Sequence, residues 1–373
     1  MKKNIVFVNN TLGEGGAEKV LIDILNRLDY EKYNVTLFLL ENQGVRFENL
    51  NKNVKLKYLY PNIEIKGYIS SRIWNILKYR IMKYFYWLVH FICIGMKNDV
   101  EIAFIEGEPT RFVSQSLNKR SRKIAWVHTD LKKRRPQEIN ELYKNIYERF
   151  DEIVCVSNSS KRALNNIYKD LNKNVQVIYN LIEIDEIKNL SNEPIKFNFN
   201  KPTIISVGRL TKIKRMDLII RAHKNIIDKG IEHDLIILGI GEEYDNLVSL
   251  TEKLNVKESV HFLGYKKNPY PYIKKADLFV IASEFEGFSL VIAESIVLGK
   301  AIVSTDNGGA TELLGDMLYS ELVDVNDLNA LTKAIYEVLI NTKIKCDLEL
   351  KSKEKAKVFD NVNVMQSIHN IIS

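Results

Sequence analysis

The stretch DLFVIASEFEGFSLVIAESIVLGKAIVST, residues 277–305, decides the fold class. Residues 277–283 form an apolar run rich in β-branched side chains, 289–298 follow a helical pattern, and a second apolar run occupies 301–305. Apolar runs without polar alternation are typical of strands buried on both faces of a sheet. A strand, helix and strand in this order predict a parallel sheet covered by helices.

The same alternation continues in both directions along the chain. Further apolar runs lie at 4–9, 34–40, 100–105, 123–128, 152–157, 175–180, 203–208, 234–239 and 260–264. We interpret the polar stretch 183–201, which contains Pro194, as the linker between two sets of strands. The 373 residues also favour two domains rather than one.

We therefore predict an α/β protein with two doubly wound, Rossmann-like domains that face a central cleft. The expected divisions are a first Rossmann-like domain at 1–182, a second at 183–355 and a C-terminal helix at 356–373.

Composition limits the class of protein. The chain is 46% hydrophobic and 27% charged, which is ordinary for a soluble globular protein. Its cysteines, Cys93, Cys155 and Cys346, have neither metal-ligand spacing nor a disulfide pattern. Because residues 3–9 fit a first β-strand better than a secretion signal, we expect a cytoplasmic protein.

The net charge of +7 is uneven. Residues 1–182 carry 30 Lys and Arg against 19 Asp and Glu, a net +11, whereas the rest carries 24 against 28, a net −4. This asymmetry indicates an anionic surface or acceptor near the first half, although a basic face that serves only solubility fits as well. We expect no nucleic-acid partner.

Two loops of the second half carry the chemistry of a phosphate and sugar site. Gly208 and Arg209 directly follow a strand, and Lys214 lies at the end of the same basic loop. Arg offers a planar fork and Lys a point charge, a pairing that suits a diphosphate. A basic loop of this kind also fits simple solvation.

The second loop, residues 283–294, follows another strand and opens a helix. Its carboxylates, Glu286 and Glu294, would repel a diphosphate, but each can accept two hydrogen bonds from a vicinal diol. Backbone N–H groups near Leu290 and Val291 suit the phosphate. The turn between them supplies Gly287, Phe288 and Ser289.

Other strand ends add weaker candidates, each of which also fits a plain structural joint. These are Gly15 and Gly16 in the first glycine turn, Gly241 after the strand 234–239, Tyr265 beside a possible nucleobase site, the turn 304–312, and His128 after the strand 123–128.

The ordered segments GGAEKV, WVHTD, GRLTKIKR, EFEGFSLVIAE and STDNGGATE resemble family four of the retaining glycosyltransferases, which have the two-domain GT-B fold. The resemblance implies that Arg209 and Lys214 bind the donor diphosphate, that Glu286 contacts the donor sugar, and that Glu294 holds the ribose. It also implies that His128 lies near the reacting carbon, and that Gly15 and Gly16 face the phosphate or the acceptor. Arg215 departs from the family pattern, where Gly is frequent.

The resemblance implies transfer of a hexose or N-acetylhexosamine from a nucleotide sugar to a glycan or lipid-linked acceptor in bacterial surface polysaccharide assembly. The expected donor is a UDP-sugar, bound by the nucleotide-sugar-binding domain 183–355, and the acceptor lies on the side of the domain 1–182. We find no Asp-x-Asp pair at a strand end, so we expect a metal-independent site without a cofactor, and retention by front-face attack. A nucleotide-sugar epimerase of the same fold and a catalytically silent partner subunit remain as alternatives.

Residues 66–98 alternate basic and aromatic side chains with aliphatic ones. The longest uncharged run is about 13 residues, short of the ~20 needed to span a bilayer. The pattern suits a helix lying on an anionic membrane, helped by the basic residues 132–135. A large helix packed on the first sheet is the alternative. On the first interpretation, the protein attaches peripherally to the inner face of the plasma membrane, and this is what we expect.

Overall fold

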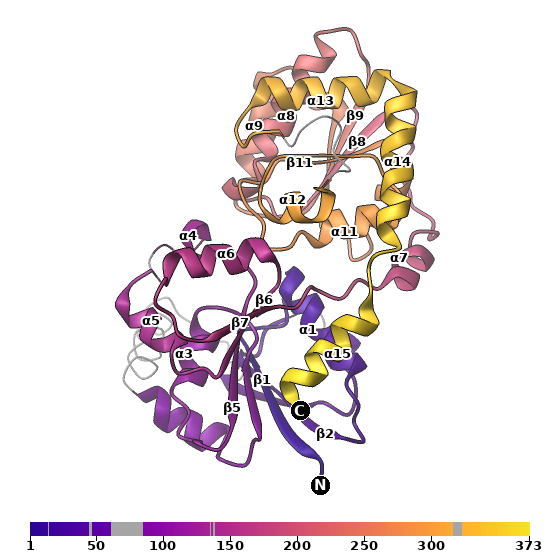
Figure 1. Ribbon diagram of the computed structural model, residues 1–373. Helices are drawn as coiled ribbons and strands as arrows, with labels where there is room; N and C mark the ends of the chain where they lie inside the picture. Colours follow the sequence, from indigo (N-terminus) through magenta and orange to yellow (C-terminus); the bar gives the residue numbers. More distant parts are fainter. Residues whose placement is uncertain (14, 45–46, 61–84, 135, 137–138, 316–322) are drawn as a thin grey trace, which may run out of the picture. The chain divides into compact units, whose positions relative to one another are not determined.

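A computed structural model describes the chain except for residues 14, 45–46, 61–84, 135, 137–138 and 316–322. The described chain divides into two compact units, the first made of Met1–Leu181 with Val362–Ser373 and the second of Ile182–Asn361. Each unit contains one parallel sheet, so the predicted α/β class with two Rossmann-like sheets is confirmed. Figure 1 shows both units.

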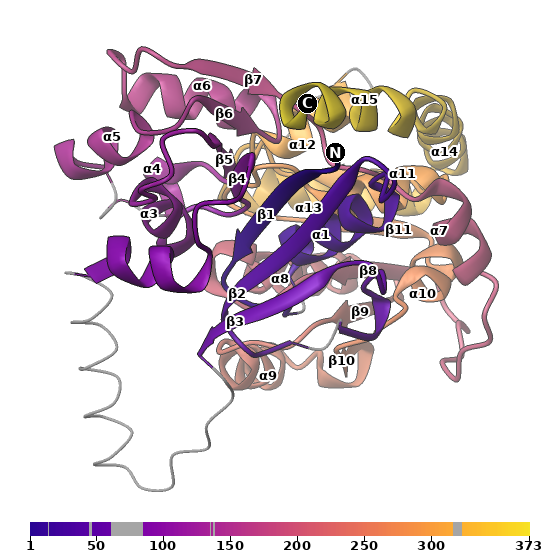
Figure 2. The same ribbon diagram turned by 90° about the horizontal axis from the view of Figure 1, so that it is seen from below.

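The sheet of the first unit has the order β3-β2-β1-β4-β5-β6-β7 among the described residues, and all its pairs are parallel. Figure 2 shows its strands from below. The strands are β1 (Lys3–Asn9), β2 (Tyr33–Glu41), β3 (Lys55–Tyr60), β4 (Val100–Ala103), β5 (Arg122–Val127), β6 (Glu152–Cys155) and β7 (Asn174–Val177).

Helices cover this sheet because its strands are apolar on both faces. Residues 5–8 of β1 are each at most 1% exposed, although neighbouring side chains point to opposite faces. The helices with printed bounds are α1 (Gly16–Arg27), α3 (Glu108–Ser114), α4 (Leu131–Arg134), α5 (Glu141–Tyr147), α6 (Asn158–Ile167) and α15 (Asn361–Ile372). A further helical segment covers 85–93.

The second sheet has the order β10-β9-β8-β11-β12, again with parallel pairs. Its strands are β8 (Thr203–Val207), β9 (Asp234–Leu238), β10 (Val260–Gly264), β11 (Leu278–Ile281) and β12 (Ile302–Ser304). The helices of this unit are α7 (Ile184–Leu190), α8 (Met216–Ile227), α9 (Tyr244–Lys253), α10 (Tyr270–Lys275), α11 (Leu290–Val297), α12 (Gly309–Leu314), α13 (Leu328–Ile340) and α14 (Thr342–Ala356).

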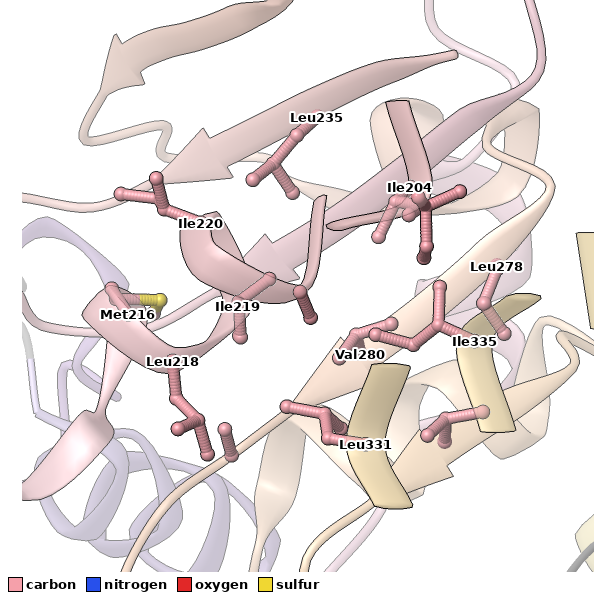
Figure 3. Packing of buried hydrophobic residues seen from close by; sticks show 14 of the residues in the cluster. Ile204, Met216, Leu218, Ile219, Ile220, Leu235, Leu278, Val280, Leu331 and Ile335 are labelled. Atoms are coloured by element: carbon pink, nitrogen blue, oxygen red, sulfur yellow. The ribbon is translucent and has the colours of Figure 1, made fainter. Parts of the chain in front are cut away.

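Two cores sandwich the second sheet. Ile204, Leu278 and Val280 face α8 and α13, as Figure 3 shows. The alternate residues, including Ile205 and Phe279, join the core formed with α7, α10, α11 and α12. This burial on both faces explains the uninterrupted apolar runs of the sequence.

Each sheet has a point where the strand order reverses. In the first unit this point lies between β1 and β4, and in the second it lies between β8 and β11. Loops after such strands diverge to opposite faces and leave a crevice where open α/β sheets bind ligands. The loops that begin at Gly208 and Ser283 therefore flank the reversal point of the second sheet.

Two segments differ from expectation. The predicted linker 183–201 contains helix α7, whose Ile187 is 1% exposed and packs into the second core, so this interpretation is wrong. Within the region 356–373, the helix is α15, which begins at Asn361 because α14 continues to Ala356. Helix α15 returns to the first unit, where the His369 and Tyr33 rings stack at 5.8 Å.

The segment expected at a membrane is described only in part. Residues 66–84 of the range 66–98, and residue 135 of the basic range 132–135, lie outside the described residues. No helix in the described part of the chain is long and apolar enough to cross a bilayer.

Candidate functional site

The centre of the candidate site is an ion pair at the reversal point of the second sheet. Lys214 Nζ lies 2.5 Å from Glu286 Oε1, and Ser283 Oγ donates to the same carboxylate oxygen at 2.9 Å. The side chains of Lys214 and Glu286 are 21% and 13% exposed, so partial desolvation strengthens the attraction. The structure thus pairs Lys214, which the sequence assigned to the diphosphate, with Glu286, which it assigned to the donor sugar. Both assignments toward a ligand stay predictions.

The basic loop is built to present Lys214. Residues Lys212–Lys214 form a short 3₁₀ turn after β8, and α8 starts directly behind it. Between them Arg215 adopts a left-handed conformation with φ of 49°, which is the backbone geometry that favours glycine. This conformation gives a physical reason for the Gly that the family often has at this position.

Arg215 ties the basic loop to the acidic one. Its guanidinium binds Asp217 at 3.0 Å and approaches Glu284 Oε1 at 3.5 Å, while Glu284 N donates to Ile213 O at 2.9 Å. The hydrogen bond with Asp217 raises the pKa of Arg215 above its usual value. These contacts fix the two loops against each other.

The third loop, after β12, supports Glu286 from its backbone. Glu286 N donates to Asn307 O at 2.9 Å, and Gly309 N donates to Glu286 O at 3.1 Å. A Cβ on Gly309 would lie 3.0 Å from Glu286 Cβ, so glycine permits this close approach. Thr305 Oγ1 also donates to Ser283 O at 2.8 Å.

Sequence reasoning missed Asn307 as an individual residue of this loop. Its side chain is 2% exposed, and its Oδ1 accepts the Ala310 N–H at 2.8 Å at the start of α12. Its Nδ2 is buried without a hydrogen-bond partner in the part of the chain that the structure describes. Such a group is costly unless a ligand or water satisfies it.

Glu294 lies on the second turn of α11 and is 5% exposed. It accepts a hydrogen bond from Tyr270 Oη at 3.0 Å, a partner that the sequence did not indicate. Ser289 precedes α11 as its N-cap, yet its buried Oγ forms no hydrogen bond with the described residues. The Ser289 hydroxyl therefore does not cap the first N–H groups of α11, which are those of Leu290 and Val291. Gly287 and Phe288 precede Ser289 in the same turn.

Two glycines predicted to bind the donor have different surroundings. A Cβ on Gly241 would lie 2.2 Å from Leu210 O, so backbone packing alone demands glycine there. A Cβ on Gly208 would lie 3.7 Å from Met216 Cε and 3.8 Å from Lys214 Cδ, which is ordinary contact. Nothing in the described structure therefore requires glycine at 208.

The remaining donor-side predictions lie nearer the surface. Arg209 is exposed, and its side chain forms no hydrogen bond or ion pair with the described residues. Tyr265 follows β10, the edge strand two places from β8, and is 38% exposed.

The candidates of the first unit follow β1, at the reversal point of its sheet, and β5, the strand beside β4. Gly15 is the extended N-cap of α1, which begins at Gly16 directly after the loop that follows β1. His128 follows β5, and its backbone N donates to Glu106 Oε2 at 3.0 Å. Its ring centre is 4.9 Å from that of Phe104.

Glu106 is a further residue that the sequence reasoning missed. It follows β4, is 2% exposed, and holds the backbone at His128. The signal was present, because the segment VEIAFIEGE ends a buried strand with a carboxylate and a glycine. A buried carboxylate at the end of β4 fits a residue that holds the loop carrying His128 in place.

The comparisons with known proteins cover both units. Residues 14–186 match the family described as Glycosyltransferase Family 4, and residues 188–358 match Glycosyl transferases group 1. A Campylobacter jejuni relative, N-acetylgalactosamine-N,N'-diacetylbacillosaminyl-diphospho-undecaprenol 4-alpha-N-acetylgalactosaminyltransferase, is 30% identical, and the match covers 98% of this chain and 97% of the relative. The chain belongs to the family-four glycosyltransferases.

Solved structures agree on the fold of this glycosyltransferase. Anabaena HepE in complex with UDP-glucose has a TM-score of 0.77 at 19% identity, with 98% of each chain covered. WaaG, a glycosyltransferase involved in lipopolysaccharide biosynthesis, has a TM-score of 0.67 at 13% identity, with 99% of each chain covered. The predicted GT-B fold is confirmed, as is the prediction that the protein is a glycosyltransferase enzyme.

Proposed function

We propose that this glycosyltransferase moves a hexose or N-acetylhexosamine from a UDP-sugar to a glycan or lipid-linked acceptor, with retention and without a metal, in bacterial surface polysaccharide assembly. The observation that carries the proposal is the Lys214–Glu286 pair beside the start of α11 at the sheet's reversal point. It combines a cation, a carboxylate and the first N–H groups of a helix within two adjacent loops, those after β8 and β11.

These groups match the parts of a nucleotide sugar. Lys214 Nζ, the exposed Arg209 side chain and the first N–H groups of α11 bind the diphosphate, because all of these attract phosphate oxygens. Glu286, held by Ser283, accepts hydrogen bonds from the donor sugar's hydroxyls. The buried Glu294 accepts those of the ribose.

The same groups suit the chemical step. Sugar transfer passes through an oxocarbenium-like state, as glycoside hydrolysis does, while negative charge grows on the departing diphosphate. Preorganised cations and N–H groups stabilise that charge without reorganising. Arg209 and Lys214 thereby fill the role that a divalent cation would otherwise take, and front-face attack retains the anomeric configuration.

The nature of donor and acceptor is supported by similar proteins. HepE is solved with UDP-glucose, and the Campylobacter relative is named for transferring N-acetylgalactosamine to a diphospho-undecaprenol-linked substrate. A lipid-linked acceptor requires that the enzyme reach a membrane surface, and we place this protein on the inner face of the plasma membrane.

The described part of segment 66–98 supports membrane contact. Its helical residues 85–93 and the turn behind them expose a set of large apolar side chains: Phe85, Trp87, Leu88, Phe91, Ile92 and Met96, between 37% and 70% exposed. The opposite side of the helix is anchored, because Tyr86 donates to Glu108 and His90 Nε2 lies 3.2 Å from the buried Glu101. An exposed apolar face on the unit with a net charge of +11 over 1–182 complements an anionic lipid surface.

Vesicle binding tests the membrane part. We expect the protein to sediment with vesicles containing phosphatidylglycerol at low salt, and the double variant Trp87→Ser/Phe91→Ser to lose this binding. Leu350→Ser, which removes a comparably exposed apolar side chain from α14, is the matched control. Equal binding by both variants would contradict the assignment.

Thermal shift with UDP-, GDP- and ADP-sugars tests the donor. A true donor at about 100 times its dissociation constant stabilises the protein by about 2.7 kcal/mol. Anomeric NMR of the product then tests retention, and activity in excess EDTA tests metal independence. An inverted linkage, or activity abolished by EDTA and restored by Mg²⁺, would each contradict the corresponding part. Donor turnover without an acceptor would favour an epimerase instead.

A further inference from the structure

We propose that Tyr270 is a positioning residue that orients the Glu294 carboxylate toward the donor's ribose, and thereby sets the preference for ribonucleotides over nucleotides that lack the ribose diol. The inference rests on the proposed function, because it takes Glu294 as the ribose ligand. It adds a residue outside every motif that the sequence singled out.

The contact between the two side chains is direct and buried. Tyr270 Oη donates to Glu294 Oε1 at 3.0 Å, and the two residues are 6% and 5% exposed. Tyr270 is the first residue of α10, and Glu294 lies in α11 on the other side of strand β11 in sequence. Both helices pack on the same core, so the contact joins two elements that the sheet already holds together.

The backbone of Tyr270 is itself fixed. Asn268 Oδ1 accepts the Tyr270 N–H at 3.1 Å, and Asn268 Nδ2 donates to Leu190 O at 2.9 Å and to Glu193 Oε2 at 2.7 Å. Helix α10 also has prolines on both sides of Tyr270. The phenol therefore reaches Glu294 from a rigid starting point.

This geometry has a consequence for recognition. A diol is bound well only when the carboxylate plane is held in one orientation, since both hydroxyls must reach it at once. A long Glu side chain loses several rotamers when it binds, and a partner that fixes it beforehand reduces that cost. The hydroxyl of Tyr270 provides this fixation through a charge-assisted hydrogen bond.

The test compares Tyr270→Phe with the wild-type protein by isothermal titration of UDP and of 2',3'-dideoxy-UDP. Tyr272→Phe is the matched control, because it removes the other tyrosine hydroxyl of the same helix, whose ring faces Lys266 at 5.9 Å. We expect Tyr270→Phe to weaken UDP binding by about fivefold. We expect its affinity for dideoxy-UDP to match that of the wild type, and Tyr272→Phe to leave both affinities unchanged.

The ratio of the two affinities within each variant keeps the test valid if Tyr270→Phe folds incompletely, because an unfolded fraction changes the stoichiometry rather than the ratio. An unchanged ratio in Tyr270→Phe would overturn the positioning role. Glu294→Ala separates this from the proposed function. If it bound UDP as tightly as the wild type, the ribose assignment itself would fall, and the role of Tyr270 with it.

Discussion

Gly208 and Gly241 provide a matched pair of substitutions that separates donor binding from backbone packing. Each of these glycines follows a strand of the second sheet, and the sequence predicted that each would bind the donor. The structure distinguishes them, because a Cβ at 241 would meet Leu210 O at 2.2 Å, whereas a Cβ at 208 meets side-chain atoms only at 3.7 Å or more. We therefore expect Gly241→Ala to damage the fold and Gly208→Ala to damage the site.

The expected magnitudes follow from these distances. At 241 the Leu210 carbonyl must move by more than 1 Å to reach normal contact, and overpacking of this kind costs about 1–3 kcal/mol. At 208 the backbone has no left-handed φ, so alanine is accommodated and stiffens the unfolded chain, a gain of about 0.4–1 kcal/mol. The new methyl group would, however, lie beside the Lys214 side chain, where we propose that the diphosphate binds, and we expect it to hinder that binding.

Urea unfolding and donor thermal shift measure the two effects separately. Gly241→Ala should lose about 1–3 kcal/mol of unfolding free energy. Gly208→Ala should gain about 0.4–1 kcal/mol of unfolding free energy but lose most of the shift that the true UDP-sugar donor produces. If Gly208→Ala were as unstable as Gly241→Ala, Gly208 would be a packing residue. If it kept the full shift, the diphosphate would lie elsewhere.

Three further predictions concern groups to which we assign no direct contact with the donor. Burial lowers the pKa of His223 to about 3, and it also lowers the pKa of the hydrogen-bonded His233, so both stay neutral in the fold. Because the histidines of the unfolded chain take up protons below pH 6.5 and the buried ones do not, the free energy of unfolding falls as the pH drops from 6.5 toward 3. His223 alone should lower this free energy by about 2 kcal/mol at pH 5 relative to neutral pH. A urea midpoint that does not change with pH would contradict this. Arg215→Gly should be about 1 kcal/mol more stable than Arg215→Ala, because both lose the same ion pairs but only glycine suits φ of 49°; equal urea midpoints would refute the strain. Burial raises the pKa of Cys155 to about 12, so iodoacetamide at pH 8 should label the exposed Cys346 and spare Cys155 until urea unfolds the protein.

The sequence predicted most strands because their apolar runs are buried on both faces. It missed β3, where Lys55 and Lys57 alternate with apolar residues. Among the described residues, that strand lies at the sheet edge and pairs only with β2. The alternation is a valid strand signal, but its partner depends on the tertiary fold. The linker interpretation of 183–201 failed for a related reason, since Ile187 becomes a core residue only when α7 meets α10 and α11.

The candidate site was predictable at the level of loops and not of contacts. Strand-end position brought Lys214, Glu286 and Glu294 to attention, because parallel strands gather their carboxyl ends at one edge. The pairing of Lys214 with Glu286 depends on the spacing between two loops 72 residues apart. Tyr270 lies in no motif, and only the packing of α10 beside α11 shows its contact with Glu294.

The central claim is that Lys214 binds the donor diphosphate at the reversal point of the second sheet. Isothermal titration of UDP into the wild type, Lys214→Ala and Lys212→Ala tests it most directly, because Lys212 lies in the same 3₁₀ turn, carries the same charge and is exposed. We predict a loss of about 30-fold for Lys214→Ala, the value of a charge-assisted hydrogen bond, and less than about threefold for Lys212→Ala. Equal losses in both variants, or none in either, would contradict the account.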